Sequence, residues 1–248
     1  MKILALIPAR MGSTRFPGKP MAPILGKPMI GHVYERACRA KNIDLVAVAT
    51  CDKEIYDYIE SIGGTAILTS DQHERASDRC AEALLQLEEM EGSRYDIVVM
   101  VQGDEPMTHP EMLEEALKPM LQDPKVLIVN LMYPIDKDEL EDRNCVKVVC
   151  DLESNAMYFS REPIPTRFKT DDIPIAKQVA IMPFRRDFLL DYAKMTPTPL
   201  EIIESVDMLR VMEHGLKVHM APTKHKTYAV DIPSDIQRVE MEMRKLDN

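Results

Sequence analysis

The chain has 248 residues, which is enough for one large α/β domain or two small ones. Its 31 Lys and Arg face 41 Asp and Glu, and the formal net charge of −10 opposes broad attraction to nucleic acid or anionic membranes. We therefore expect no nucleic-acid partner and no membrane partner. No window is apolar for long enough to span a bilayer, and the five cysteines lack CxxC spacing. We expect a cytoplasmic protein without a signal peptide, a disulfide framework or a zinc site.

The first half of the chain alternates between apolar runs typical of buried strands and amphipathic stretches typical of helices. In chain order the pattern predicts a strand at 2–8, a helix at 28–40, a strand at 45–50, a helix at 53–62 with Gly63 past its end, a strand at 65–69, a helix at 76–90, a strand at 96–106, a helix at 109–122 and a strand at 126–135. Strands that alternate with helices pair in parallel through right-handed crossovers. We therefore expect an α/β fold with a doubly wound, mostly parallel sheet.

The second half contains short strand candidates around a proline-rich stretch at 162–174. The pattern predicts strands at 146–151, 156–162, 178–184 and 217–222 and a closing helix at 234–246. We expect these strands to be a mixed extension of the same sheet, which makes 1–248 a single domain.

The loop LIPARMGSTRFPGK at 6–19 gathers Arg10, Arg15 and Lys19 directly after the first strand. Its small residues leave backbone N–H groups free to face phosphate oxygens, and the cations would neutralise the phosphate charge. Forked arginine and compact lysine together suit a polyphosphate better than one carboxylate. The loop matches neither GxxxxGK[ST] nor GxGxxG, which argues against a Rossmann dehydrogenase. We favour phosphate binding over the alternative, a solvated turn with scattered cations.

The stretch PARMGSTRFPGKPMAPILGKPMI resembles the N-terminal signature of sugar nucleotidyltransferases. Together with VQGDEP and AMYFSRE, it resembles the bacterial cytidylyltransferases that activate 3-deoxy-manno-octulosonate (Kdo). The likeness continues through PLE at 199–201, LR at 209–210 and VDIPSDI at 230–236. It implies a nucleotide-diphospho-sugar transferase fold and a Mg²⁺-dependent enzyme that transfers CMP from CTP to an acidic sugar and releases pyrophosphate. It also implies a homodimer formed around 155–185 and a role in lipopolysaccharide biosynthesis.

The resemblance also implies roles for individual residues. It assigns nucleotide binding to Arg10, Ser13, Arg15, Lys19, Arg75, Ser77 and Gln102, catalysis to Arg10, Arg15, Lys19 and Asp104, Mg²⁺ binding to Asp104 and Asp231, and sugar binding to Arg161, Gln178, Glu204 and Asp207. Attack of a sugar hydroxyl on an α-phosphate makes a matching demand, because Mg²⁺ and cationic side chains stabilise the developing charge. Taken alone, Asp104 would better suit a turn before Pro106, and Asp231 a cap before the final helix. Together with the cationic loop at 6–19, we favour metal binding, more firmly for Asp104 than for Asp231.

The chain departs from the family pattern at the turn before helix 76–90. The HxSGT-like turn of the family reads HERAS here, so Ala76 replaces a glycine and Arg75 a small residue. Backbone approach to the nucleotide must therefore differ. Arg75 either adds a phosphate or sugar contact or is an exposed arginine at the helix start.

A second departure concerns the sugar. The KHxGxYxY-like segment reads KQVAIMPF, so that Gln178 replaces a sugar-contacting His, Met182 replaces a Tyr, and Pro183 is expected to interrupt the strand. The EQLR-like segment begins with Asp207 and Met208, without its Gln. Fewer hydrogen-bonding groups suit a polyhydroxy acid less well. The change indicates either another substrate, such as a modified Kdo, a nonulosonate or another sugar, or drift with compensation. A catalytically inactive nucleotide-binding regulator is the third hypothesis.

Overall fold

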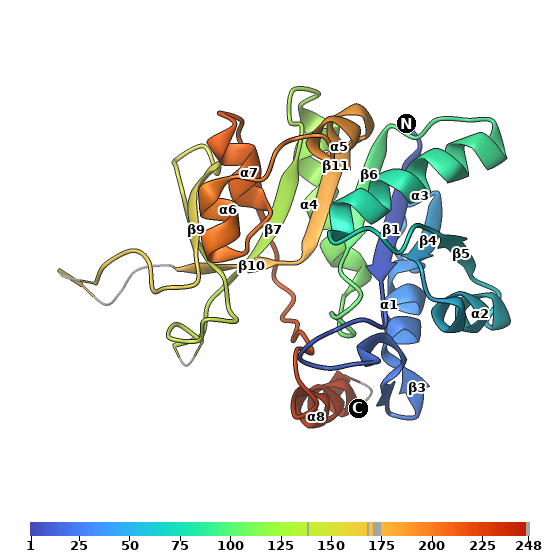
Figure 1. Cartoon of the computed structure of the whole chain (residues 1–248). Helices are drawn as coiled ribbons and strands as arrows, with labels where there is room; N and C mark the ends of the chain where they lie inside the picture. Colours follow the sequence, from blue (N-terminus) through green and yellow to red (C-terminus); the bar gives the residue numbers. More distant parts are fainter. Residues whose placement is uncertain (138, 168, 171–174, 247–248) are drawn as a thin grey trace. The chain divides into compact units, whose positions relative to one another are not determined.

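The computed structural model describes residues 1–137, 139–167, 169–170 and 175–246 (Figure 1). Packing contacts divide the chain into two compact units, which comprise residues 1–114 with 227–248 and residues 115–226. The helix α4 (Pro110–Gln122) contains the boundary between 114 and 115. The single domain over 1–248 stays a prediction.

The first unit contains a parallel sheet with the strand order β6-β1-β4-β5. The four strands are β1 (Ile3–Ala9), β4 (Leu45–Thr50), β5 (Thr65–Leu68) and β6 (Ile97–Val101). The helices that alternate with them are α1 (Met29–Ala37), α2 (Lys53–Ser61) and α3 (Ala76–Glu91), and all three contact the sheet. This arrangement confirms the predicted parallel α/β sheet. Every residue of β1 and β6 is buried, as continuous apolar runs require in a sheet that is covered on both faces.

The loop after β1 leads into short elements before α1. These are a 3₁₀ turn η1 (Lys19–Met21) and a two-stranded hairpin of β2 (Pro23–Ile24) and β3 (Lys27–Pro28). The closing helix α8 (Asp235–Leu246) packs here, because Val239 and Met243 share a buried cluster with Ile24 and Met29. The cluster anchors the segment 227–246 to the N-terminal part of the unit.

The second unit has its own mixed sheet with the order β12-β7-β10-β8-β9. Its strands are β7 (Val129–Pro134), β8 (Lys147–Cys150), β9 (Ala156–Ser160), β10 (Ala176–Val179) and β12 (His219–Pro222). The β12–β7 pair is parallel, whereas β10 pairs with β7 and β8, and β8 with β9, in antiparallel fashion. For these five strands, the expectation that the second half extends the first sheet is wrong.

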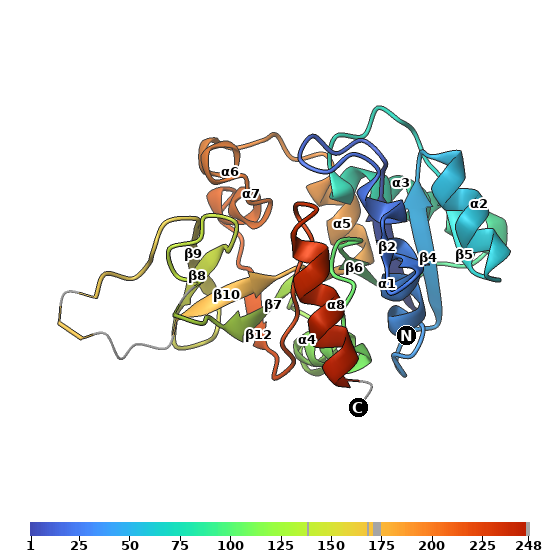
Figure 2. The same ribbon diagram turned by 90° about the horizontal axis from the view of Figure 1, so that it is seen from below.

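The predicted strand at 178–184 is two strands. β10 ends at Val179, and β11 (Ile181–Arg185) starts after a bend at Ala180. The interruption expected at Pro183 is wrong, because Pro183 lies inside β11. Three short helices follow, α5 (Arg186–Tyr192), α6 (Pro199–Glu204) and α7 (Met208–Glu213). Figures 1 and 2 show α6 and α7 side by side next to β9.

In the described part of the chain, no helix combines the length and the apolar character that crossing a bilayer requires.

Candidate active site

The first unit contains a cavity of about 340 Å³ with three walls. They are the loop after β1, the segment from His73 to Arg79 that enters α3, and the loop after β6. The cavity therefore lies at the carboxyl ends of β1 and β6, where parallel α/β sheets bind ligands. It brings together seven predicted site residues, namely Arg10, Ser13, Arg15, Lys19, Arg75, Gln102 and Asp104.

The loop after β1 is closed by its own backbone. The carbonyl of Met11 accepts hydrogen bonds from the N–H groups of Ser13 and Gly18, both at 3.0 Å. The N–H of Met11 donates to Asp52 Oδ2 at 2.8 Å, which ties the loop to the residue before α2. Gly18 has φ +75°, a left-handed conformation that costs glycine little. These contacts hold the loop in a curve that presents its cations to the cavity.

The loop after β6 approaches β1 closely at Gly103. A Cβ at this position would lie 3.0 Å from the carbonyl oxygen of Pro8. Glycine therefore lets Gln102 and Asp104, which flank it, reach the same cavity as the first loop.

Both predicted metal ligands pair with cations of the first loop. Lys19 Nζ lies 2.8 Å from Asp104 Oδ2 and also donates to the carbonyl of Val230 at 2.9 Å. Arg15 Nη2 lies 2.8 Å from Asp231 Oδ1. The N–H of Val230 donates to the carbonyl of Asp104 at 2.9 Å, so the chain segment of the second carboxylate is fixed beside the first.

The hydrogen bonds of the turn before α8 distinguish between the two roles considered for Asp231, helix cap and metal ligand. The backbone N–H groups of Asp231 and Ile232 both donate to Asp235 Oδ2, at 2.8 and 3.0 Å. The carboxylate that accepts backbone N–H groups at this turn is thus Asp235, while the Asp231 carboxylate pairs with Arg15. Asp104 and Asp231 supply hard oxygen ligands with side-chain exposures of 29% and 25%. Such a donor set fits Mg²⁺, which takes one or two carboxylates together with water and phosphate oxygens.

The wall from His73 to Arg79 is held by its own network. Glu82 accepts hydrogen bonds from the Ser70 N–H and pairs with the His73 ring. The His73 carbonyl accepts from Arg10 Nη1 at 3.4 Å and Arg79 Nη2 at 3.5 Å. His73, Glu82 and Arg79 are site-forming residues that the sequence analysis missed. Their only sequence signal is the short distance from the HERAS turn.

The two predicted residues of this wall differ in position. Arg75 is half-buried and lines the cavity, which favours a ligand contact over a solvated helix start. Ser77 is fully buried in the first turn of α3 and is not among the lining residues. Its Oγ has no hydrogen-bond partner among the described residues.

The cavity is positively charged although the chain is acidic. Five cationic residues line it, against two acidic ones, Glu74 and Asp104; the cations are Arg10, Arg15, Lys19, Arg75 and Arg79. A cavity of this charge, in a chain with a net charge of −10, suits a small polyanion.

The predicted sugar-binding residues lie in the second unit, where Arg161 and Glu204 form one network. Glu204 accepts hydrogen bonds from the hydroxyl groups of Tyr158 and Ser160 and from the Arg161 N–H. The Arg161 guanidinium donates to three backbone carbonyls, those of Glu204 at 2.5 Å, Arg143 at 2.8 Å and Ser205 at 3.2 Å. The structure thus brings two of the four predicted residues together.

Gln178 and Asp207 have other partners in the same unit. Gln178 Nε2 donates to Oδ1 of the buried Asn130 at 2.6 Å. Asp207 precedes α7, and its backbone carbonyl accepts a hydrogen bond from the Tyr192 hydroxyl at 3.0 Å.

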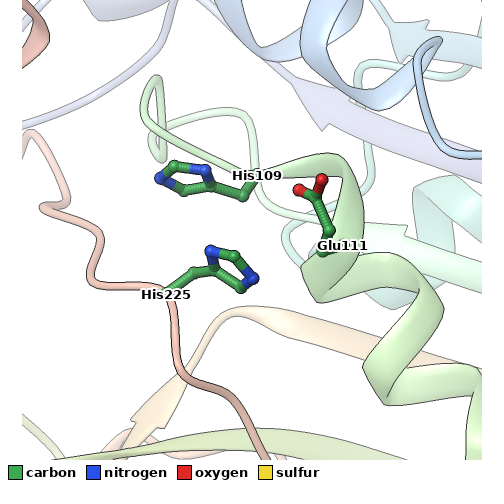
Figure 3. A group of neighbouring side chains, drawn as sticks. All are labelled: His109, Glu111 and His225. Atoms are coloured by element: carbon green, nitrogen blue, oxygen red, sulfur yellow. The ribbon is translucent and has the colours of Figure 1, made fainter. Parts of the chain in front are cut away.

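Three further titratable side chains, labelled in Figure 3, do not line the cavity. His109 and Glu111 lie at the start of α4, and the His109 N–H contacts Met112 Sδ at 3.3 Å. In the second unit, the N–H of His225 donates to Thr223 Oγ1 at 3.1 Å. We assign these side chains no part in the cavity.

Comparison with known proteins identifies the family to which this chain belongs. A family model described as cytidylyltransferase matches residues 4–220, so the chain belongs to the cytidylyltransferase family. A relative from Geobacter metallireducens is 41% identical over 96% of each chain, and one from Geotalea uraniireducens is 42% identical over 99% of this chain and 100% of its own. Both are named 3-deoxy-manno-octulosonate cytidylyltransferase, and the chain belongs to their family.

Solved structures agree with this assignment. The structure of CMP:2-keto-3-deoxy-manno-octonic acid synthetase complexed with CTP has a TM-score of 0.90 and 36% identity, over 99% of each chain. A 4-diphosphocytidyl-2C-methyl-D-erythritol synthase from Anaerococcus prevotii shares the fold, with a TM-score of 0.61 at 12% identity. The expected nucleotide-diphospho-sugar transferase type of α/β fold is confirmed.

Proposed function

We propose that this protein is a Mg²⁺-dependent enzyme that transfers CMP from CTP to Kdo or a closely related acidic sugar and releases pyrophosphate. The observation that carries the proposal is the cationic cavity at the ends of β1 and β6, which is flanked by two carboxylates. The family to which the chain belongs supports cytidine as the nucleoside and Kdo as the acceptor.

The first loop would bind the triphosphate. Arg10, Arg15 and Lys19 line the cavity together with the small residues Gly12 and Ser13, whose backbone a phosphate can approach closely. Gln102, which follows β6, lines the same cavity and would contact the cytidine. When the triphosphate enters, Arg15 and Lys19 would exchange their carboxylate partners for phosphate oxygens.

Asp104 and Asp231 would hold the Mg²⁺ through their carboxylate oxygens. When bound, Mg²⁺ supplies Lewis-acid stabilisation of the charge that develops on the phosphate oxygens. The cations of the loop would add to this stabilisation because they are positioned before the substrate arrives.

Arg161 remains a candidate for the sugar carboxylate. A guanidinium has five N–H donors, and the structure uses one each on Nε, Nη1 and Nη2. The second N–H of Nη1 and of Nη2 can therefore still meet a carboxylate, while the three carbonyls hold the guanidinium in place.

A modified octulosonate is the second candidate acceptor. One N–H of Gln178 Nε2 donates to Asn130, so its second N–H and its carbonyl oxygen remain for a ligand. An acceptor at this position suits a hydroxyl or an amino group on the sugar.

We also propose that the protein is a cytoplasmic homodimer that serves lipopolysaccharide biosynthesis. Light scattering would measure the mass of the particle in solution and so test the dimer.

The test is pyrophosphate release from CTP in the presence of Mg²⁺ and a panel of acidic sugars. We expect release with Kdo or a modified Kdo, and none when the sugar or the metal is omitted. UTP, ATP and GTP with each sugar serve as matched controls. CTP binding without release on any sugar would favour the inactive regulator instead.

A further inference from the structure

Arg79, in the first turns of α3, is a buried arginine beside the cavity. It is only 2% exposed, yet it belongs to the cavity lining. Nη1 donates to Thr69 Oγ1 and Nη2 to the His73 carbonyl. Both acceptors are neutral, and no carboxylate of the described residues forms an ion pair with Arg79 in the structure.

This pairing is unusual for a buried arginine, because the guanidinium stays protonated under all ordinary conditions. The other buried arginine of the described residues, Arg210, is also 2% exposed but pairs with both carboxylate oxygens of Glu201, at 2.8 and 2.7 Å. The buried Lys147 also has only carbonyl partners, but burial lowers the pKa of this lysine. Arg79 stays protonated, and its buried charge is energetically costly unless a negatively charged group lies beside it.

The cavity is where that partner would lie. Arg79 borders it together with Arg10, whose Nη1 shares the His73 carbonyl with Arg79 Nη2. The two guanidinium groups are thus held on a common carbonyl, and this places a second cation next to a predicted nucleotide ligand. Two cations that share one acceptor favour the binding of an anion beside them.

We propose that Arg79 is a further nucleotide-binding residue, whose buried charge is neutralised by the phosphates of the bound nucleoside triphosphate. This inference rests on the proposed function, because it takes CTP as the ligand of the cavity. The buried position gives the charge more weight than that of an exposed arginine, since water screens it less. Arg79 also links the ligand to Thr69 and His73, and so to the wall that Glu82 holds.

The sequence pattern alone does not predict that Arg79 binds the nucleotide. Arg79 falls inside the predicted helix 76–90, where an arginine is expected on the solvated face. Only the burial and the neutral partners distinguish it from a surface residue.

The test is calorimetric titration of CTP and of uncharged cytidine into the wild-type protein and the Arg79→Gln variant. Glutamine can still donate a hydrogen bond to Thr69 or to the His73 carbonyl, so we expect the variant to fold. We expect its Kd for CTP to rise by about tenfold or more, the range of a charge-assisted hydrogen bond, and its Kd for cytidine by less than about threefold. Arg39→Gln removes an exposed arginine outside the cavity and should leave both Kd values unchanged.

The outcomes separate the inference from the proposed function. A wild-type protein that binds no CTP contradicts both. A wild-type protein that binds CTP, with Arg79→Gln folded and binding CTP equally tightly, contradicts only the role of Arg79. An equal loss of CTP and cytidine affinity also contradicts it, because the phosphates would then not be the partner. If Arg79→Gln does not fold, the same titrations with Arg79→Met decide, because this variant removes the charge and keeps an unbranched side chain. A larger rise in Kd for CTP than for cytidine supports the role of Arg79, and equal changes in the two Kd values contradict it.

Discussion

Lys19 Nζ lies 2.8 Å from Asp104 Oδ2, so the cation predicted to bind phosphate and the carboxylate predicted to bind metal form an ion pair. The Arg15–Asp231 pair repeats this relationship at the same distance. In each pair the cation and the carboxylate compensate each other's charge. With a metal–nucleotide complex bound, the two cations would face phosphate oxygens and the two carboxylates would face the metal. No charge would then be left uncompensated.

Asp104→Asn tests the metal role. The amide keeps the size of the side chain but weakens binding of a divalent cation and leaves Lys19 without its ion pair. We expect turnover to fall by roughly a hundredfold or more, with little change in the circular dichroism spectrum. The matched control is Asp57→Asn, which removes an exposed carboxylate that pairs with Lys53. Retained turnover in Asp104→Asn would refute the assignment.

Arg15→Gln separates function from stability. The Arg15 side chain is 57% exposed, and an exposed ion pair is worth about 0–1 kcal/mol. We therefore expect the free energy of unfolding in urea to change by less than about 1 kcal/mol. The KM for CTP should nevertheless rise, because a phosphate contact is lost. An unchanged KM would mean that Arg15 serves only to hold Asp231.

Glu201→Gln tests whether the PLE and LR motifs are structural. Glu201 and Arg210 have side-chain exposures of 3% and 2%, and they form a bidentate pair between α6 and α7. Removal of one partner leaves a buried arginine uncompensated, so we expect a loss of about 3–5 kcal/mol in the free energy of unfolding. Chemical denaturation measures this loss, with Asp57→Asn as the exposed comparison. A loss below about 1 kcal/mol would contradict the structural role.

His219 gives the stability a pH dependence. Burial lowers the pKa of His219 from its ordinary value of 6.5. Between the two pKa values the unfolded chain binds more protons than the folded one, so the free energy of unfolding decreases as the pH falls below 6.5. The loss levels off below the pKa of the folded state. Burial lowers the pKa of His32 as well, so His219→Gln should make the pH profile shallower without flattening it.

Denaturant titrations of His219→Gln and the wild type between about pH 5 and 8 measure the profile. An identical slope in the two proteins would show that His219 does not contribute.

Much of the first unit is predictable because its signals are local. The strand at Ile3–Ala9 is a continuous apolar run, and the loop behind it carries the residue types that the site needs. The loops after β1 and β6 meet in the cavity, because parallel strands end at the same edge of a sheet.

The second unit was harder to predict because its order depends on pairing between distant segments. β7 lies between β12 and β10, although the sequence places four strands between β7 and β12. The helices α5, α6 and α7 have only six or seven residues each, too few for a clear periodic pattern. The proximity of Arg15 to Asp231 is likewise absent from local sequence, and only the family resemblance indicated a shared role.

A crystal structure with CTP and Mn²⁺ in place of Mg²⁺ tests the central claim most directly. The account predicts an anomalous peak for the metal between the carboxylates of Asp104 and Asp231, with the triphosphate against Arg10, Arg15 and Lys19. A metal bound elsewhere, or CTP outside the cavity at the ends of β1 and β6, would contradict it.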